Sequence, residues 1–270
     1  MQTTSQLREH YEIERQLADR LRSASKDERK TLYTSLYDEL FKRVPHHPQL
    51  SKRTEKTTKA TQRQARFLGK LCKQRKPVFL EVGPGDCAIS LEMAKYDAQV
   101  YAVDVSNEIT NHIAPPRNFS LILSDGCSVD VPKESVDLAF SNQLMEHLHP
   151  DDAIAQLHNI YSALKPGGKY FIVTPSRFSG PHDVSQHFDD VATGFHLHEY
   201  SLDELMEECR NVGFSKFTTY IGKDGSYLSV PIWVVRFTEK IAGHLPKKWR
   251  KFSPLRLLLG IRLMAERGML

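Results

Sequence analysis

The sequence has no long apolar run and little cysteine. No segment approaches the roughly 20 consecutive apolar residues that a membrane-spanning helix needs. The first residues, MQTTSQLREHYEIERQ, are too polar for a secretory signal peptide. The four cysteines are widely separated and form no CxxC pair, which argues against a disulfide framework or a cysteine zinc site. We therefore expect a cytoplasmic protein.

The net charge of the 270-residue chain is only +4, but the charge is unevenly distributed. Residues Lys52–Lys76 include ten basic residues and one acid, and Arg236–Arg267 include nine basic residues and two acids. Such segments either cover an anionic partner or form solvated helix faces. No aromatic interleaving or RNA-binding module accompanies the first segment, so the solvated face is favoured and a nucleic-acid partner is not expected.

The most informative stretch is Val78–Ser90, VFLEVGPGDCAIS. Its first residues are apolar and suit a buried strand, the Gly-Pro-Gly turn interrupts that run, and helical spacing resumes at Ala88. A strand, a glycine turn and a helix form the usual binding corner for a nucleotide-like ligand in an open α/β sheet. The glycine spacing alone would also fit a dinucleotide-binding dehydrogenase.

Two acids favour a different ligand. Glu81 precedes the glycine turn, where a carboxylate suits an ammonium group better than a phosphate. Asp104 ends a second apolar run, Val100–Asp104, and an acid at this point accepts hydrogen bonds from ribose hydroxyls. A ligand with ribose and a cationic amino-acid end, but no phosphate, describes S-adenosylmethionine better than NAD.

With these motifs, residues 79 to 217 resemble the class I S-adenosylmethionine-dependent methyltransferases. Ser124-Asp125-Gly126 is similar to the family's turn after the third strand, which meets the adenine, and Val136–Asn142 is similar to the fourth strand and the start of the active-site loop. Leu164–Gly168 is similar to the turn before strand five. The resemblance implies S-adenosyl-L-methionine as cofactor. The residues that it assigns to the cofactor are Glu81, Gly83, Gly85, Asp104, Val105, Asp125, Gly126, Ser141 and Asn142.

The order of elements predicts the fold class and three parts of the chain. We expect an α/β, Rossmann-like three-layer sandwich with a seven-stranded, mostly parallel sheet and an antiparallel last strand. Residues 1–76 are predicted to be a helical extension that serves as a lid or a dimer arm, and residues 77–235 the methyltransferase domain. An Asp-Gly turn at 224–225 is expected to join the last two strands as a hairpin.

Residues 236–270 are predicted to be a basic, amphipathic tail. The stretch Leu255–Met264 is apolar with interspersed arginines, and we interpret it as a helix. Such a helix would pack on the N-terminal extension or on a second subunit, and peripheral contact with an anionic membrane is the alternative.

Histidines concentrate beside the expected donor site. Seven of the twelve lie between residues 147 and 198. We expect Glu146, His147, His182 and His187 to orient and deprotonate an acceptor. The pattern Gln143-x-x-Glu146-His147, followed by His196, is similar to the metal site of small-RNA 3′-end methyltransferases, but glutamine replaces the first acid. A metal site formed by Glu146, His147 and His196 is therefore the less favoured, minority interpretation, and we expect no bound metal ion.

The sequence thus predicts methyl transfer to a small-molecule, sugar or lipid-linked acceptor, at oxygen rather than nitrogen or carbon. The preference for oxygen rests on the His- and Asp-rich loop. Alternatives are a metal-assisted RNA 2′-O-methyltransferase and a non-catalytic S-adenosylmethionine-binding protein.

Overall fold

The computed structural model describes residues 3–47, 50, 54–72, 74–106, 114–246, 249–250 and 258–269. The N-terminal extension is helical, as predicted, and consists of α1 (Thr4–Ser23), α2 (Lys26–Arg43) and α3 (Glu55–Leu71). Each of these helices starts at a capping box, in which the side chain of Thr3, Ser25 or Thr54 accepts a hydrogen bond from the amide three residues later. The second helix ends just before Pro45, which disfavours helix in the residue before it.

A single sheet of eight strands follows within the described residues, in the order β3-β2-β1-β4-β5-β8-β6-β7. The first five strands in this order are parallel to one another. Strand β8 pairs antiparallel with both β5 and β6, and β7 pairs antiparallel with β6. The strands are β1 (Val78–Val82), β2 (Gln99–Asp104), β3 (Phe119–Leu123), β4 (Val136–Asn142), β5 (Leu164–Pro175), β6 (Phe214–Lys223), β7 (Ser226–Val230) and β8 (Gly260–Arg267).

The predicted fold class is confirmed, but the prediction for the end of the chain is wrong. The hairpin across Asp224-Gly225 forms, but β7 ends at Val230 because Pro231 starts a helix, α7 (Ile232–His244). The predicted apolar helix at Leu255–Met264 is wrong for residues 260–264, which belong to β8; residues 255–257 lie outside the described residues. The sheet thus has eight strands instead of seven, and the methyltransferase unit extends beyond residue 235 to Arg267.

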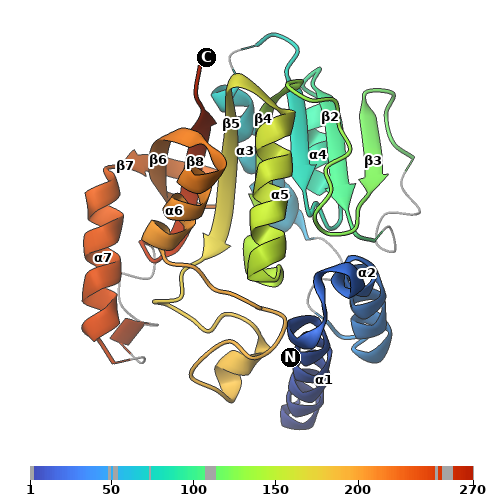
Figure 1. The fold of residues 1–270 in the computed structure, drawn as a ribbon, viewed down its shortest axis with the longest axis vertical. Coiled ribbons are helices and arrows are strands. Elements are labelled where there is room, and N and C mark those ends of the chain that lie inside the picture. Colours follow the sequence, from blue (N-terminus) through green and yellow to red (C-terminus); the bar gives the residue numbers. More distant parts are fainter. Residues whose placement is uncertain are drawn as a thin grey trace.

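Helices cover both faces of the sheet and give the expected three layers (Figure 1). The helices α3 and α4 (Ala88–Ala94) pack on one face, and α5 (Pro150–Ala163) and α6 (Leu202–Val212) on the other. Two apolar clusters fill the space between these layers, one on each face. The exposed side of α3 carries its basic residues, while Gln64, Ala65 and Leu68 are buried.

Helices α1 and α2 lie side by side at the end of the sheet to which the parallel strands point (Figure 1). The long segment between β5 and α6 lies at the same end, beside α1. The carboxyl edge, where ligands bind in open α/β sheets, is therefore covered by parts of the chain from outside the sheet. None of the helices in the described ranges is both long and apolar enough to cross a membrane.

Candidate active site

The turn after β1 forms the first wall of the site. Gly83 and Gly85 have φ angles of 67° and 55°, in the left-handed region that glycine adopts at little cost. A Cβ atom on Gly83 would lie 2.8 Å from Cδ1 of Leu144, so the close approach of this loop also excludes a side chain. The turn and Ala88, at the start of α4, line a cavity of about 490 Å³. This volume lies within the range of about 300–1,000 Å³ that is usual for small-molecule sites.

Glu81 is buried at the carboxyl end of β1 and lines this cavity. The hydroxyl of Ser90 donates a hydrogen bond of 2.5 Å to its Oε2. Burial raises the pKa of Glu81 to about 8, although the hydrogen bond from Ser90 acts in the other direction. Among the described residues no cation pairs with this carboxyl group. A ligand that brings an ammonium group would supply the missing charge.

Asp104 ends β2 and lines the same cavity. Its Oδ2 accepts a hydrogen bond from the amide of Gly85 at 3.1 Å, and its Oδ1 accepts one from the amide of Val105 at 2.7 Å. Burial raises the pKa of Asp104, and the backbone amides oppose that rise. The amide of Ser106 also donates to Oδ1, at 3.3 Å, so the carboxylate is fixed against the glycine turn and Oδ2 keeps a further lone pair for a ligand hydroxyl.

Most of the residues that the sequence assigns to the cofactor lie on this cavity. They come from the ends of β1, β2 and β4 and from the turn after β3. These residues are Glu81, Gly83, Gly85, Asp104, Val105, Gly126 and Asn142.

Two residues of that assignment do not line the cavity. The carboxylate of Asp125 turns back on its own loop and accepts hydrogen bonds from the amides of Cys127 and Ser128 at 2.9 and 2.7 Å. Ser141 is fully buried, and its hydroxyl lies 2.7 Å from that of Tyr170. Both residues therefore make contacts within the protein that support the residues around the cavity, and neither faces the cavity itself.

Helix α2 supplies aromatic walls that the sequence patterns do not predict. Tyr33, Tyr37 and Phe41 line the cavity from the side opposite the sheet. The ring of Tyr33 lies so close to Gly126 that a Cβ there would be 2.6 Å from its Cδ2. Gly126 has a φ of 91°, so its conformation and its neighbour both require glycine.

A buried ion pair fixes α2 over the cavity. Arg29 donates to both carboxylate oxygens of Asp152 in α5, at 2.6 and 2.9 Å, and both side chains are almost fully buried. The hydroxyl of Tyr33 donates a third hydrogen bond to Asp152 at 2.8 Å. The hydroxyl of Thr34 donates to the carbonyl oxygen of Val105 at 2.7 Å. The position of α2 is thus set by polar contacts to two separate parts of the core.

A second cavity, of about 320 Å³, adjoins the first. Tyr37, Gln143 and His147 line both cavities. The other walls of the second cavity come from α1, from the end of α2 and its following loop, and from the segment between residues 182 and 196. A ligand in the second cavity would therefore meet a ligand in the first at these three side chains.

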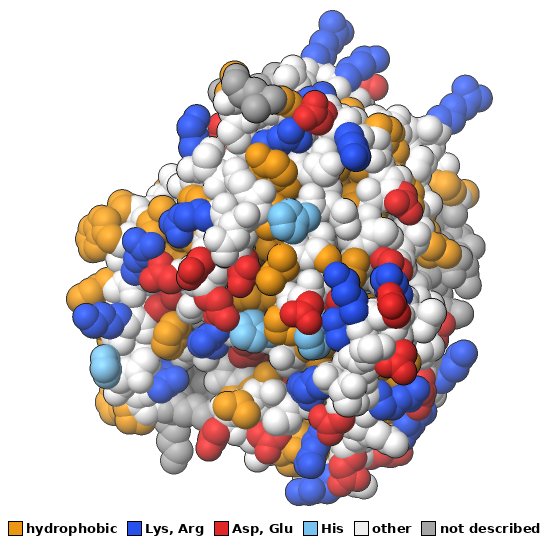
Figure 2. Space-filling view, viewed as in Figure 1, with side chains coloured by type: hydrophobic (Ala, Val, Ile, Leu, Met, Phe, Trp, Pro, Cys, Tyr) orange, Lys and Arg blue, Asp and Glu red, His pale blue; other side chains and the backbone are white. Residues whose placement is uncertain are grey.

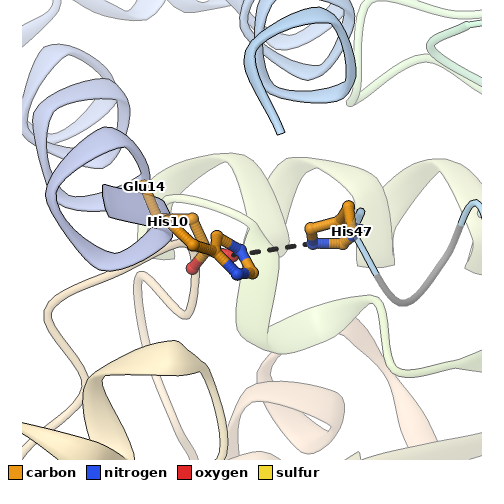
Figure 3. Close-up of side chains that lie close together, drawn as sticks. All are labelled: His10, Glu14 and His47. Atoms are coloured by element: carbon orange, nitrogen blue, oxygen red, sulfur yellow. Dashed lines mark hydrogen bonds and ion pairs between the residues drawn. The ribbon is translucent and has the colours of Figure 1, made fainter. Parts of the chain in front are cut away.

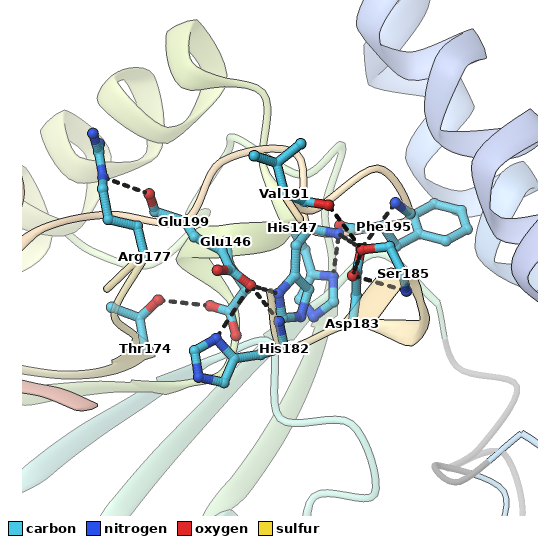
Figure 4. A network of polar contacts seen from close by, with 12 residues as sticks. Glu146, His147, Thr174, Arg177, His182, Asp183, Ser185, Val191, Phe195 and Glu199 are labelled. Atoms are coloured by element: carbon cyan, nitrogen blue, oxygen red, sulfur yellow. Dashed lines mark hydrogen bonds and ion pairs between the residues drawn. The ribbon is translucent and has the colours of Figure 1, made fainter. Parts of the chain in front are cut away.

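His147 is the only predicted catalytic residue, among those the structure describes, that lines both cavities. Its Nδ1 lies 3.0 Å from the carbonyl oxygen of Phe195 (Figure 4). A carbonyl only accepts, so Nδ1 carries the proton and Nε2 carries a lone pair. Burial, followed by the nearby His196, lowers the pKa of His147 to about 3, so the imidazole is neutral at physiological pH.

Glu146 belongs to a buried polar network beside His147 (Figure 4), and His196 lies close to both residues. Glu146 is fully buried and lines neither cavity. Its Oε2 accepts a hydrogen bond from Thr174 at 2.9 Å, whereas its Oε1 has no hydrogen-bond partner among the described residues. Nδ1 of His196 lies 2.7 Å from Oε1 of Glu199. Burial lowers the pKa of His196, but Glu199 and Glu146 outweigh this effect and raise it.

The structure brings together the three residues of the minority metal interpretation. One ligand atom each of Glu146, His147 and His196 lies within 4.8 Å of the others. Nδ1 of His196 interacts with Glu199, which leaves its Nε2 as the nitrogen that could bind a metal ion. Gln143 is exposed on the wall of both cavities.

His182 and His187 both line the second cavity. The ring nitrogens of His182 are engaged, Nδ1 at 3.3 Å from Glu199 and Nε2 at 3.0 Å from the hydroxyl of Ser179. His187 is exposed at the end of a short 3-10 turn, Val184–His187. His182 is thus placed to hold the loop, and His187 to contact a ligand at the cavity mouth.

The strand order, the helices on both faces and two acids on one cavity at the carboxyl edge define a class I S-adenosylmethionine-dependent methyltransferase. Residues 80–172 match the family model described as a methyltransferase domain, and this part of the chain is such a domain. The chain therefore carries a methyltransferase domain whose cavity suits S-adenosylmethionine. No curated protein matches the sequence.

Solved structures with a similar fold include methyltransferases of several organisms and a [4+2]-cyclase. A phosphoethanolamine N-methyltransferase of Haemonchus contortus has a TM-score of 0.51 and 18% identity over 77% of this chain, which spans about half of that enzyme (52%). A methyltransferase of Thermotoga maritima has a TM-score of 0.52 and 14% identity, covering 89% of this chain and 99% of that one. The 1,6-didemethyltoxoflavin-N1-methyltransferase of Burkholderia thailandensis has a TM-score of 0.52 and 16% identity, covering 91% of both chains. At these identities the likeness concerns the fold.

Proposed function

We propose that the protein transfers the methyl group of S-adenosylmethionine to an oxygen of a small-molecule, sugar or lipid-linked acceptor bound in the second cavity. The observation that carries this proposal is the sharing of Tyr37, Gln143 and His147 by two adjoining cavities. The cofactor supplies an electrophilic methyl group on a sulfonium. Glu81 and Asp104 are placed to bind its amino-acid and ribose parts in the first cavity.

His147 is the side chain that we assign to the acceptor hydroxyl. Its Nε2 has a lone pair, and the contact of Nδ1 with the carbonyl of Phe195 fixes that tautomer. A pKa of about 3 makes His147 a weak base, so its main contribution is a hydrogen bond that orients the hydroxyl. Displacement at a sulfonium methyl group needs chiefly an aligned nucleophile, and positioning can supply much of the acceleration.

The N-terminal helices are proposed to act as the lid of both cavities. Tyr33, Tyr37 and Phe41 of α2 line the first cavity, and His10 and Glu14 of α1 line the second. A lid at this position would exclude water from the transfer. Because α2 also contacts the core through Arg29 and Asp152, we favour this role over that of a dimer arm.

The assay is methyl transfer from labelled donor to a panel of hydroxylated acceptors, with calorimetry of S-adenosylhomocysteine binding alongside. His147→Ala is expected to lower turnover about 100-fold, the cost that a misplaced acceptor can have, while the donor Kd stays unchanged. His158→Ala, an exposed histidine on α5, is the matched control. Unchanged turnover in His147→Ala would remove this residue from the mechanism, and failure to bind S-adenosylhomocysteine would refute the proposal as a whole.

Metal-assisted methylation is the second candidate, because Glu146, His147 and His196 lie together. Activity that survives EDTA would exclude it. An RNA acceptor has less support, since the basic side chains of α3 lie on its exposed side and its apolar side packs on the sheet.

A lipid-linked acceptor is supported by the exposed face of α7. Trp233 and Phe237 are 67% and 60% exposed, and Arg236 and Lys240 lie on the same face at helical spacing. Figure 2 shows hydrophobic and basic side chains over α7 at the left edge of the molecule. Aromatic and basic residues on one helix face suit the surface of an anionic membrane. Trp233→Ser with Phe237→Ser should abolish co-sedimentation with phosphatidylglycerol vesicles if this helix, instead of the predicted tail helix, contacts the lipid.

A further inference from the structure

A cluster of two histidines and a glutamate lies in the lid (Figure 3) and shares no residue with the cluster of Glu146, His147 and His196. His10 and Glu14 are four residues apart on one face of α1, and His47 comes from the loop after α2. Oε1 of Glu14 lies 2.7 Å from Nε2 of His10 and 3.6 Å from Nε2 of His47. One ligand atom of each residue lies within 4.8 Å of the others.

Burial makes this cluster unusual. The side chains of His10 and Glu14 are only about 5% exposed, and that of His47 is 11% exposed. Two imidazole nitrogens point at one carboxylate oxygen, while Nδ1 of His10 is buried without a hydrogen-bond partner. Buried polar groups with incomplete partners destabilise a fold relative to apolar side chains of similar size. Packing alone therefore gives no reason for three such groups to meet here.

We propose that His10, Glu14 and His47 form a binding site for a divalent transition-metal ion, and that Zn²⁺ is the ion that fits it. Two imidazole nitrogens and one carboxylate oxygen are a donor set that zinc accepts, whereas Mg²⁺ and Ca²⁺ prefer oxygen ligands alone. A histidine and a glutamate four residues apart on a helix place both ligands on one side of it. Three protein ligands leave a fourth tetrahedral position open.

The open position faces the second cavity, because all three residues line it. If the second cavity holds the acceptor, as the proposed function has it, an oxygen of the acceptor completes the coordination of the ion. The ion would also strengthen the connection between α1 and the loop after α2, which already meet at Glu14 and His47. The cluster thus links closure of the lid to recognition of an oxygen-bearing ligand.

The test is zinc binding by the full-length, metal-free protein, with neither donor nor acceptor present. We expect one Zn²⁺ per chain by calorimetry, a visible absorption spectrum of four-coordinate Co²⁺ at the same site, and a rise in Tm with zinc. Glu14→Gln and His47→Ala should each weaken zinc binding by at least the 10–100-fold that the loss of an outer-shell partner costs. The control variant His158→Ala, on the exposed side of α5, should bind like the wild type.

A second control separates the two histidine clusters. His196→Ala changes only the Glu146 cluster, and it should keep the zinc affinity and the Co²⁺ spectrum. Loss of binding in His196→Ala with retention in Glu14→Gln would place the ion at the other cluster and overturn the inference, as would a wild-type protein that binds no zinc. Circular dichroism identifies any variant that fails to fold, and the wild-type stoichiometry and spectrum then still decide. Zinc binding without binding of S-adenosylhomocysteine would refute the proposed function alone.

Discussion

Replacing Glu81 by Gln is expected to weaken donor binding and to abolish its dependence on pH. In the free protein burial raises the pKa of Glu81 from 4.5 to about 8, so only about a tenth of these carboxyl groups are ionised at pH 7. The ammonium group of the donor interacts with the ionised form, so binding at pH 7 should release about 0.9 proton. Each pH unit below 8 then costs about 1.4 kcal/mol, which is tenfold in Kd.

Calorimetry of S-adenosylhomocysteine binding at pH 6, 7 and 8, in two buffers of different ionisation enthalpy, measures both quantities. For the wild type, Kd should fall about tenfold from pH 6 to pH 7 and level off near pH 8, where the α-amino group of the ligand begins to lose its proton. For Glu81→Gln, proton release should vanish, and Kd at pH 8 should be about 10- to 100-fold weaker, because a hydrogen bond to a charged group is worth about 1.5–3 kcal/mol. Equal Kd values, or unchanged proton release, would refute the assignment of Glu81 to the ammonium group.

The raised pKa of Glu81 also predicts that Glu81→Gln makes the free protein more stable at high pH. A carboxyl group whose folded pKa is raised contributes stability below its unfolded pKa of 4.5, and this contribution is lost as the pH rises through about 8. The rise in the pKa of Glu81 from 4.5 to about 8 corresponds to ~5 kcal/mol in the free energy of unfolding. Urea unfolding of Glu81→Gln at pH 8 should therefore give a larger free energy of unfolding than the wild type, with little difference at pH 5. Glu207→Gln, at an exposed position of α6, serves as the control.

Three further substitutions test other walls of the site. Tyr37→Phe should leave the free energy of unfolding unchanged, because the hydroxyl of Tyr37 makes no hydrogen bond within the described residues. The same substitution should lower kcat/KM for the acceptor by about 2- to 10-fold. A loss of stability with unchanged kcat/KM would instead make this hydroxyl structural. Arg29→Ala leaves Asp152 as an unpaired buried charge, so urea unfolding should show a loss of about 3–5 kcal/mol, and a loss below 1 kcal/mol would contradict the buried pair. Gly83→Ala, at a φ of 67°, should weaken binding of S-adenosylhomocysteine by tenfold or more, whereas Gly69→Ala, with open space in α3, should not.

The parallel half of the fold can be predicted because its signals are local. Strands β1 and β2 are short, mostly apolar runs, and the glycine turn and the acids at strand ends follow directly in the sequence, so Glu81 and Asp104 are recognisable from the sequence alone. The prediction of a helix at Leu255–Met264 is wrong because this mostly apolar stretch masks the alternation of Ile261, Leu263 and Ala265, whose side chains are the buried ones. That alternation is the signal that could identify β8.

The walls contributed by the lid cannot be predicted from local patterns. Tyr33 and Tyr37 resemble ordinary apolar positions of an amphipathic helix, and nothing in the sequence around them shows that α2 lies over the carboxyl edge of the sheet. His10 and Glu14 are separated from His47 by a whole helix, so their meeting depends on how α1 and α2 pack. The i, i+4 spacing of His10 and Glu14 is a visible signal, but only tertiary structure brings the third ligand to it.

The place of β8 imposes an order on how the molecule is assembled during synthesis. This strand fills the gap between β5 and β6, yet it leaves the ribosome after both of them. From Pro175 to its partner Gly260 the ribosome must add 85 residues, roughly 4–17 s at usual rates of translation. Throughout that interval the edge of β5 that pairs with β8 is unpaired, and after Lys223 has been added the edge of β6 is unpaired as well; such edges recruit other chains. A nascent chain of this protein therefore depends on protection from neighbours until its eighth strand arrives.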